Sequence, residues 1–236
     1  MSIFKTILRK VKNRFNHYYY KNKKFNTEDE FYTYLFTKDP SWNCAGPNED
    51  ERIRLAEINQ AIKGLKIEKK IDILEVGCGR GWLCNELSVY GKTVGIEPVA
   101  PVIKYAKKMF PALEFYAELP GSFIEKFPNK KFDLIVSTEV LEHVKEKDLF
   151  MKQIQTALKP NGVIIITTPR MEIYDDFVAV YGNEPGQPVE EWMFETEVEQ
   201  LLLNNNFEVI ARKAFGPIAS KNKDAFTTQM WVFKNK

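Results

Sequence analysis

The sequence has few cysteines and no long apolar run. Its three cysteines, Cys44, Cys78 and Cys84, are odd in number and lack the pairing of a zinc site, which favours reduced thiols in the cytoplasm. No stretch approaches the roughly 20 apolar residues of a membrane-spanning helix. Charged residues also interrupt the N-terminus too early for a signal peptide. These absences argue against disulfide-rich secreted and membrane-spanning proteins, and they predict a soluble cytoplasmic one.

Acidic residues are missing from positions 1–24, where eight of the 34 basic residues gather. The rest of the chain has 26 basic against 32 acidic residues, a net charge of about −6. We therefore expect no nucleic-acid partner, because such binding depends on neutralising phosphates. Apolar residues follow helical spacing from Ile3 to Tyr20. This basic helix could make a weak contact with an anionic membrane surface, or it could pack its apolar stripe on the domain.

The chain divides into an N-terminal arm with cap helices at 1–69 and an α/β domain at 70–236. Residues 21–51 are polar and irregular, and a helix is predicted from Glu51 to Lys63. Helices are also predicted from the Gly-rich turn through Leu87, at about Val99–Met109, around Lys147–Leu158, and from a capping box, Thr196–Glu199, through Leu203. Strands are predicted at Ile71–Val76, Thr93–Ile96, Leu113–Tyr116, Phe132–Val136, Val163–Thr167, Phe207–Arg212 and Phe226–Phe233, with a turn at Lys159–Gly162.

The pattern of these elements predicts a Rossmann-like α/β fold. Five short apolar strands alternate with helices, which indicates a parallel sheet covered on both faces. No helix separates the last two strands, so they should pair antiparallel at the sheet edge. We therefore expect a seven-stranded, mostly parallel sheet with an antiparallel final strand.

A glycine-rich turn follows the first predicted strand in Ile73-Leu-Glu-Val-Gly-Cys-Gly-Arg-Gly81. Glycines let the backbone turn sharply and approach a ligand closely, at the sheet edge where open α/β sheets bind ligands. The dinucleotide fingerprint needs a glycine where this chain has Trp82, so a nicotinamide-dependent oxidoreductase is disfavoured. Glu97, at the end of the second strand, can accept hydrogen bonds from both ribose hydroxyls. The pattern favours a ligand that has ribose and adenine but no pyrophosphate.

Four ordered motifs resemble those of the class I S-adenosylmethionine (SAM)-dependent methyltransferases. They are Glu75-Val-Gly-Cys-Gly-Arg-Gly81, Gly95-Ile-Glu-Pro98, the segment from Phe132 to Val144, and Leu158-Lys-Pro-Asn-Gly-Val-Ile-Ile-Ile-Thr-Thr-Pro169. The Glu-x-x-Glu-His pattern within the third is similar to that of the ubiquinone-type O-methyltransferase group. The segment Trp42–Arg52 is similar to one in bacterial methyltransferases that modify sugars or natural products. The resemblance implies a SAM-dependent methyltransferase.

The resemblance also implies roles for particular residues. Gly77 and Gly79, with Cys78 between them, would approach the methionine part of SAM, and Glu75 would orient their loop. Glu97 would hold the ribose and Pro98 would lie near the adenine. Ser137 and Thr138 would line the floor near the sulfonium. Glu118 is the candidate for the adenine amine, although Tyr116-Ala-Glu-Leu-Pro120 departs from the usual family pattern.

His143 follows the fourth strand and is the candidate catalytic base, since an imidazole that titrates near neutrality could take a proton from a hydroxyl acceptor. The alternative is that it only packs or caps its helix. Glu139, Glu142 and His143 could instead ligate a metal ion, as the resemblance to small-RNA end methyltransferases would imply. That type of site needs a further downstream histidine, which this sequence lacks, so we predict no metal.

The insert at about 170–195 is the predicted lid, and it carries Tyr174, Tyr181, Trp192 and Phe194 beside several carboxylates. Aromatic faces next to carboxylates suit a polar, ring-bearing ligand, and equally a lid that packs on the domain. We expect O-methylation of a small-molecule or glycan-type acceptor. A methyltransferase-like SAM-binding module without turnover, and a methyltransferase acting on a lipid-linked acceptor at the membrane surface, remain alternatives.

Overall fold

The computed structural model describes residues 25–66, 70–182, 187–218, 220–222 and 224–236. Within them, seven strands form one sheet in the order β3-β2-β1-β4-β5-β7-β6. Their bounds are Ile71–Val76 for β1, Gly91–Ile96 for β2, Glu114–Tyr116 for β3, Phe132–Thr138 for β4, Leu158–Pro169 for β5, Phe207–Pro217 for β6 and Phe226–Asn235 for β7. Strands β1 to β5 are parallel, whereas β7 pairs antiparallel with both β5 and β6. The predicted fold class and the antiparallel final strand are confirmed.

Both faces of the sheet are buried. Successive side chains of a strand point to opposite sides, and the side chains on each side pack in a hydrophobic cluster of their own. Ile135 packs in one hydrophobic cluster and its neighbours Leu134 and Val136 in the other. Residues 164–166 of β5 alternate in the same way. This is why the central strands read as continuous apolar runs in the sequence.

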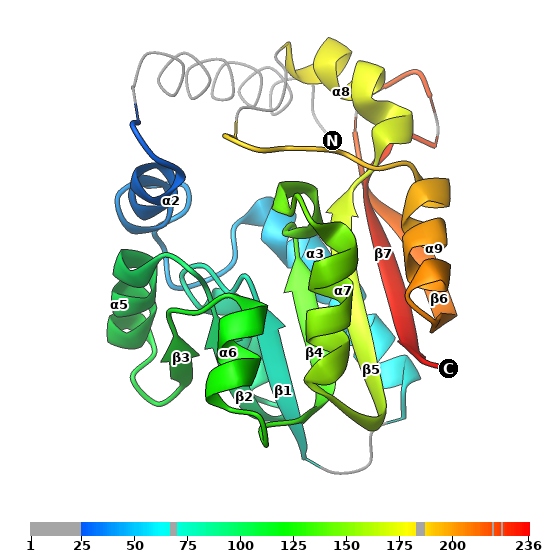
Figure 1. The fold of residues 1–236 in the computed structure, drawn as a ribbon. Helices are drawn as coiled ribbons and strands as arrows, with labels where there is room; N and C mark the ends of the chain where they lie inside the picture. The colour runs from blue at the N-terminus through cyan, green and yellow to red at the C-terminus, as the bar shows by residue number, and fades with distance from the viewer. Residues whose placement is uncertain (1–24, 67–69, 183–186, 219, 223) are drawn as a thin grey trace.

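Helices cover the sheet from both sides (Figure 1). In that view α6 (Pro120–Lys126), α7 (Lys147–Thr156) and α9 (Glu195–Asn204) lie in front of it, and α3 (Glu49–Gly64) lies behind with α4 (Trp82–Leu87). Helix α5 (Ala100–Met109) flanks the β3 edge. Helices α2 (Glu28–Thr37) and α8 (Tyr174–Tyr181) lie above the carboxyl ends of the strands, where the site is built.

Several predicted elements need correction. The irregular region 21–51 contains helix α2, capped by the Thr27 side chain, which accepts from the Glu30 amide. Helix α3 begins at Glu49 rather than Glu51, because Asn48 and Glu51 form a capping box. Helix α6 was not predicted. The turn expected at Lys159–Gly162 is part of β5, where Asn161 has φ of +62° and the register with β4 shifts.

The capping box expected at Thr196 is also wrong. Helix α9 begins one residue earlier, and the Glu197 side chain accepts a 2.8 Å hydrogen bond from the Phe194 amide.

Two other points concern the membrane prediction. The helix predicted at residues 1–20 lies outside the described residues. Within them, no helix combines the length and apolar character needed to cross a membrane.

Candidate active site

The glycine-rich turn leaves β1 and passes under α2. Gly77 and Gly79 have φ of +72° and +47°, a region that L side chains rarely adopt. A Cβ at Gly79 would lie 3.1 Å from the ring of Phe36, on α2. The Gly77 and Cys78 amides both donate to the Ile96 carbonyl, at 2.9 and 3.0 Å. The turn is therefore fixed against the end of β2, with Gly79 against Phe36 of α2 and Gly77 against Val140.

Glu75 and Cys78 lie in the interior beside this turn. Glu75 is 2% exposed, and its Oε2 has no hydrogen-bond partner among the described residues. Burial raises the pKa of Glu75 to about 8, and burial likewise raises the pKa of Cys78 to about 11. Both residues line the cavity described below. An unpartnered buried carboxyl oxygen next to a loop is unusual in a folded protein and points to a missing polar partner.

Glu97 closes β2, and its carboxylate faces the same loop. Its Oε1 accepts a 3.2 Å hydrogen bond from the Val99 amide. Burial raises the pKa of Glu97 to about 7, while backbone hydrogen bonds from Val99 and Gly79 act in the opposite direction. The side chain is thus held in place and is ready to accept further hydrogen bonds from a ligand.

The remaining predicted cofactor residues divide into two groups. Pro98, Glu118 and Thr138 line the cavity with the glycine loop. Glu118 forms a 2.9 Å ion pair with Lys126, which lowers the pKa of Glu118. Ser137 does not line the cavity. It is fully buried in β4, and its hydroxyl has no partner among the described residues.

Arg80 fastens the loop to the N-terminal helices. Its guanidinium is 1% exposed and makes a bidentate ion pair with Glu51 on α3, at 2.7 and 2.8 Å. It also donates to the carbonyls of Cys44 and Gly46, at 2.7 and 3.2 Å. Paired, fully hydrogen-bonded charges are what a buried arginine requires. The segment before α3 is therefore attached directly to the glycine turn.

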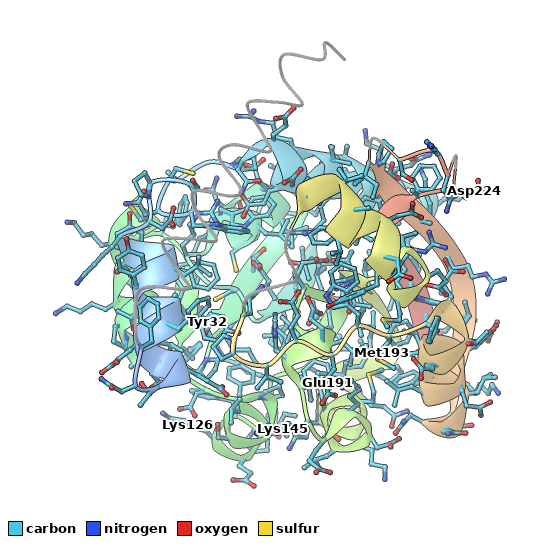
Figure 2. The ribbon with its side chains drawn as sticks, turned by 90° about the horizontal axis from the view of Figure 1, so that it is seen from above. Tyr32, Lys126, Lys145, Glu191, Met193 and Asp224 are labelled. Atoms are coloured by element: carbon cyan, nitrogen blue, oxygen red, sulfur yellow. The ribbon has the colours of Figure 1, made fainter. Side chains whose placement is uncertain are left out.

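One large cavity, of about 1010 Å³, is lined by all of the predicted cofactor residues except Ser137, and also by Arg80 and Glu51. Beyond the loop it extends between α2 and α8, where its walls include Tyr32, Phe36, Phe177 and Tyr181. The chain from Gln187 to Met193 covers it. Figure 2, seen from above, shows this segment, which carries Glu191 and Met193, running from the side of Tyr32 across the strand ends to α9. The Glu191 amide fastens it by donating to the Glu142 carbonyl at 2.9 Å.

His143 lies in the wall of this cavity, under the covering segment. Its Nδ1 contacts the Val189 carbonyl oxygen, which can only accept a hydrogen bond. Nδ1 therefore carries the proton in the neutral ring, and Nε2 carries the lone pair. Nε2 lies 3.8 Å from Glu142 Oε1, and the ring packs edge-on to Tyr32. The contact with Val189 thus leaves His143 in the tautomer that a base at Nε2 needs.

Glu139 and Glu142 have partners of their own. Glu139 accepts from the Thr167 hydroxyl at 2.9 Å and pairs with Arg54 at 3.3 Å. Glu142 accepts from the Thr168 hydroxyl at 2.9 Å, and burial, followed by the charge of Glu139, raises its pKa well above the ordinary value. Across the described ranges, no three acidic, histidine or cysteine side chains are grouped to hold a metal ion.

Residues 48–212 match the family model described as a methyltransferase domain, which is more than half of the chain. The chain belongs to this methyltransferase family. The predicted resemblance to class I SAM-dependent methyltransferases is confirmed, and so is SAM as the cofactor that the family implies. The nicotinamide alternative is excluded by the same match.

Curated proteins that are similar to this chain include ubiquinone biosynthesis O-methyltransferases. That of Bradyrhizobium diazoefficiens is 28% identical over 156 residues, which cover 62% of each chain. That of Pelagibacter ubique is 33% identical over 144 residues, or 56% of this chain and 58% of the relative. The chain thus spans about three fifths of the length of the curated relatives it matches.

Solved structures show the same fold. A protein from Pyrococcus horikoshii OT3 aligns with a TM-score of 0.67 at 19% identity, over 88% of this chain and 99% of that one. The N-methyltransferase NodS from Bradyrhizobium japonicum WM9, in complex with S-adenosylhomocysteine, aligns with a TM-score of 0.64 at 19% identity, over 89% and 99%.

The residues of this family member fit SAM on structural grounds. Gly77 and Gly79 have positive φ and line the cavity without a side chain, and Glu75, with its unpartnered oxygen, lines it too. Glu97 presents a carboxylate to the same cavity. Bound there, SAM would be held by the backbone at Gly77 and Gly79 and by the Glu97 carboxylate.

Among the site residues that the sequence analysis missed are Tyr32, Phe36, Arg54 and Arg80. Tyr32 and Phe36 come from α2, and its start was signalled by Thr27 followed by three acidic residues. Arg80 lay inside the recognised motif, but nothing in the sequence linked it to Glu51. Arg54 gave no signal, because a charged residue on an amphipathic helix ordinarily faces water.

Proposed function

We propose that this protein transfers a methyl group from SAM to an oxygen atom of a small-molecule or glycan-type acceptor. The observation that supports this most directly is the single cavity shared by the glycine loop, Glu97 and His143. When bound, SAM supplies a methyl carbon made electrophilic by its sulfonium. The protein's tasks are then to align the acceptor, exclude water and remove a proton.

His143 is the proposed catalytic base. Its Nε2 carries the lone pair and would accept the proton of the acceptor hydroxyl as the oxygen attacks. The carboxyl group of Glu142 lies 3.8 Å from Nε2 and lines the same cavity. The Val189 carbonyl keeps the ring oriented throughout. The base is thus supplied by the segment after β4 and oriented by the covering segment.

Oxygen is preferred as the acceptor atom because the curated relatives are named O-methyltransferases. Nitrogen is the competing atom, since NodS and the glycopeptide methyltransferase MtfA, which share the fold, are named N-methyltransferases. The aromatic walls beside carboxylates support a ring-bearing polar acceptor.

We also propose the division into a cap at 1–69 and a lid at about 170–195, which line the cavity from α2 and α8. A cytoplasmic location is supported by the three free cysteines. The acidic balance of residues 25–236 supports a partner other than nucleic acid. The basic residues at 1–24 support at most a weak contact with an anionic membrane surface, where a lipid-linked acceptor would be met.

A direct test is to incubate the purified full chain with methyl-labelled SAM and a panel of phenols, catechols, amines and glycosides, and to look for methylated products by mass spectrometry. S-adenosylhomocysteine binding is measured in parallel by calorimetry. We expect tight binding and at least one O-methylated product. Binding without any product would favour the SAM-binding module, and absence of binding would refute the proposal.

The role of His143 is tested by His143→Ala. If His143 is the base, kcat falls by about 10²–10⁴-fold, while the affinity for S-adenosylhomocysteine stays close to that of the parent protein. The fall of kcat at low pH, where the imidazole of a catalytic base is protonated, should also disappear in this variant. Unchanged turnover at all pH values would show that His143 only packs against the covering segment.

A further inference from the structure

A second, smaller chamber of about 270 Å³ opens beside the main cavity, at the carboxyl ends of β5 and β6 and the start of β7. The two share six wall residues, namely Arg54, Glu139, Pro169, Phe177, Tyr181 and Glu190. None of the loop residues that fit SAM lines the smaller chamber. It therefore continues the acceptor side of the cavity and is separate from the cofactor side.

The passage between the two chambers is bordered by the pair of Arg54 and Glu139. Glu139 has φ of +54°, and its amide donates to the Thr167 carbonyl at 2.9 Å, so its backbone is fixed. Its carboxylate is held by both Thr167 and Arg54. The buried Nε of Arg54 has no hydrogen-bond partner among the described residues. A hydrogen-bond donor is thus left unused where the chambers meet, and a buried unused donor is costly unless a ligand engages it.

The lining of the smaller chamber also combines aromatic rings with a fixed carboxylate. The ring of Phe177 lies 4.6 Å from that of Tyr181 and 5.1 Å from that of Trp192, between centroids. The Trp192 indole N–H donates to Glu190 at 2.8 Å. Phe215, near the end of β6, and Thr228, near the start of β7, also line the chamber. Apolar ring faces with hydrogen-bonding groups at their edges suit a ligand that has flat apolar faces and a polar rim.

The charges of the chamber narrow the class of ligand further. Among the described residues its lining includes the carboxylates of Glu139 and Glu190 and one guanidinium, that of Arg54. Arg54 is already paired with Glu139. Within the described part of the chain, a phosphate or carboxylate group would therefore meet the carboxylate of Glu190 without an unpaired cation to offset it. A neutral ring rich in hydroxyls meets neither problem.

From these features we propose that the second chamber is a sugar-binding subsite. The acceptor would then contain at least two rings, one beside His143 that receives the methyl group and a neutral sugar ring in the second chamber. This inference rests on the proposed function and adds the size and the class of the acceptor.

Saturation-transfer NMR and affinity titrations on the full chain, loaded with S-adenosylhomocysteine, test the subsite. The probes are neutral disaccharides (maltose, cellobiose, lactose), the methyl glycosides of their single rings, and a disaccharide that carries a uronic acid. We expect at least one neutral disaccharide to bind several-fold more tightly than its methyl monosaccharides, and the uronic acid to abolish that gain.

The deciding variant is Ile53→Trp. Ile53 lines only the second chamber and is 38% exposed, so a larger ring there narrows the chamber at small cost to the fold. We expect this variant to lose the extra affinity of the disaccharide over its methyl monosaccharides. Its affinities for the monosaccharides and for S-adenosylhomocysteine should stay unchanged. Val89→Trp, at a position that is 73% exposed and lines neither cavity, is the matched control.

The subsite is refuted if no neutral disaccharide exceeds its monosaccharides, if Ile53→Trp leaves the gain intact, or if the uronic acid strengthens binding. These results can be separated from a failure of the proposed function. If S-adenosylhomocysteine binds and some acceptor is methylated, only the subsite is lost. If neither occurs, the proposed function itself fails.

Discussion

At the scale of single residues, the glycine turn is the most sensitive part of the site. Gly79 combines φ of +47° with a side-chain neighbour, Phe36, 3.1 Å from the position of a Cβ. We expect Gly79→Ala to destabilise the fold by about 1–2 kcal/mol, the usual cost of an L residue in the left-handed region. It should also weaken S-adenosylhomocysteine binding. Urea unfolding and calorimetry measure the two effects.

Gly46→Ala is the control for this substitution. Gly46 has no positive φ, and nothing lies within 4 Å of the added Cβ. We expect its stability and ligand affinity to match those of the parent protein. Equal behaviour of the two alanine variants would contradict the role given to the turn.

Glu97 provides a prediction about pH. Because burial raises its pKa to about 7, it is mostly protonated at pH 6 and mostly ionised at pH 8 in the free protein. Ribose hydroxyls donate most strongly to the ionised form. The fraction of protein in which Glu97 is ionised grows from pH 6 to pH 8. We therefore expect the affinity for S-adenosylhomocysteine to rise by up to about tenfold over this range.

Glu97→Gln isolates this contribution. The variant cannot ionise, so its affinity should be lower at pH 8 and should lack the increase between pH 6 and pH 8. Calorimetry at both pH values measures the difference. An identical pH dependence in the two proteins would mean that Glu97 does not hold the ribose.

At the scale of elements, the Arg80–Glu51 pair joins α3 to the glycine turn. Both side chains are almost completely buried, at 1% and 3% exposure. We expect Glu51→Ala to cost about 3–5 kcal/mol, because it leaves the Arg80 guanidinium buried with one carboxylate fewer. Urea unfolding measures the loss, and the affinity for S-adenosylhomocysteine should fall as the turn loses its support.

Glu199→Ala is the matched control at this scale. Glu199 pairs with Arg212 at 3.6 Å, but both side chains are about half exposed. Such a surface pair contributes at most about 1 kcal/mol. If both alanine variants lowered the free energy of unfolding by the same amount, the Arg80–Glu51 pair would stabilise the protein no more than a surface pair does.

At the scale of the whole molecule, the separation of charge along the chain predicts how it meets polyanions. Residues 25–236 carry about −6, while residues 1–24 carry eight basic side chains. We expect a variant that lacks residues 1–24 to bind neither anionic vesicles in flotation nor RNA in gel shifts, because both depend on cationic contacts. Any binding by the full chain would then be due to the basic segment.

Neutral vesicles serve as the control in the same flotation. Salt-sensitive binding of the shortened variant to RNA or to anionic vesicles would contradict this prediction. It would also indicate a basic surface on the domain that the overall charge conceals.

The sequence by itself determined the central sheet and predicted the residues of the cofactor half of the site. Short apolar strands separated by helices encode a parallel sheet, and Gly77, Gly79 and Glu97 lie at strand ends that such a sheet brings to one edge. These signals are local, so the residues that carry them are adjacent or regularly spaced in the chain. The prediction that β6 and β7 pair antiparallel succeeded for the same reason.

Only the tertiary structure decided how the glycine turn is attached to α3 and which residues line the proposed acceptor half. Arg80 and Glu51 are 29 residues apart and Arg54 and Glu139 are 85 apart, and neither pair has a sequence pattern that links its members. The tautomer of His143 depends on Val189, 46 residues downstream. Contacts of this kind follow from how α2, α3 and the segment after α8 pack over the sheet. Packing depends on the whole set of side chains and therefore cannot be inferred from local spacing.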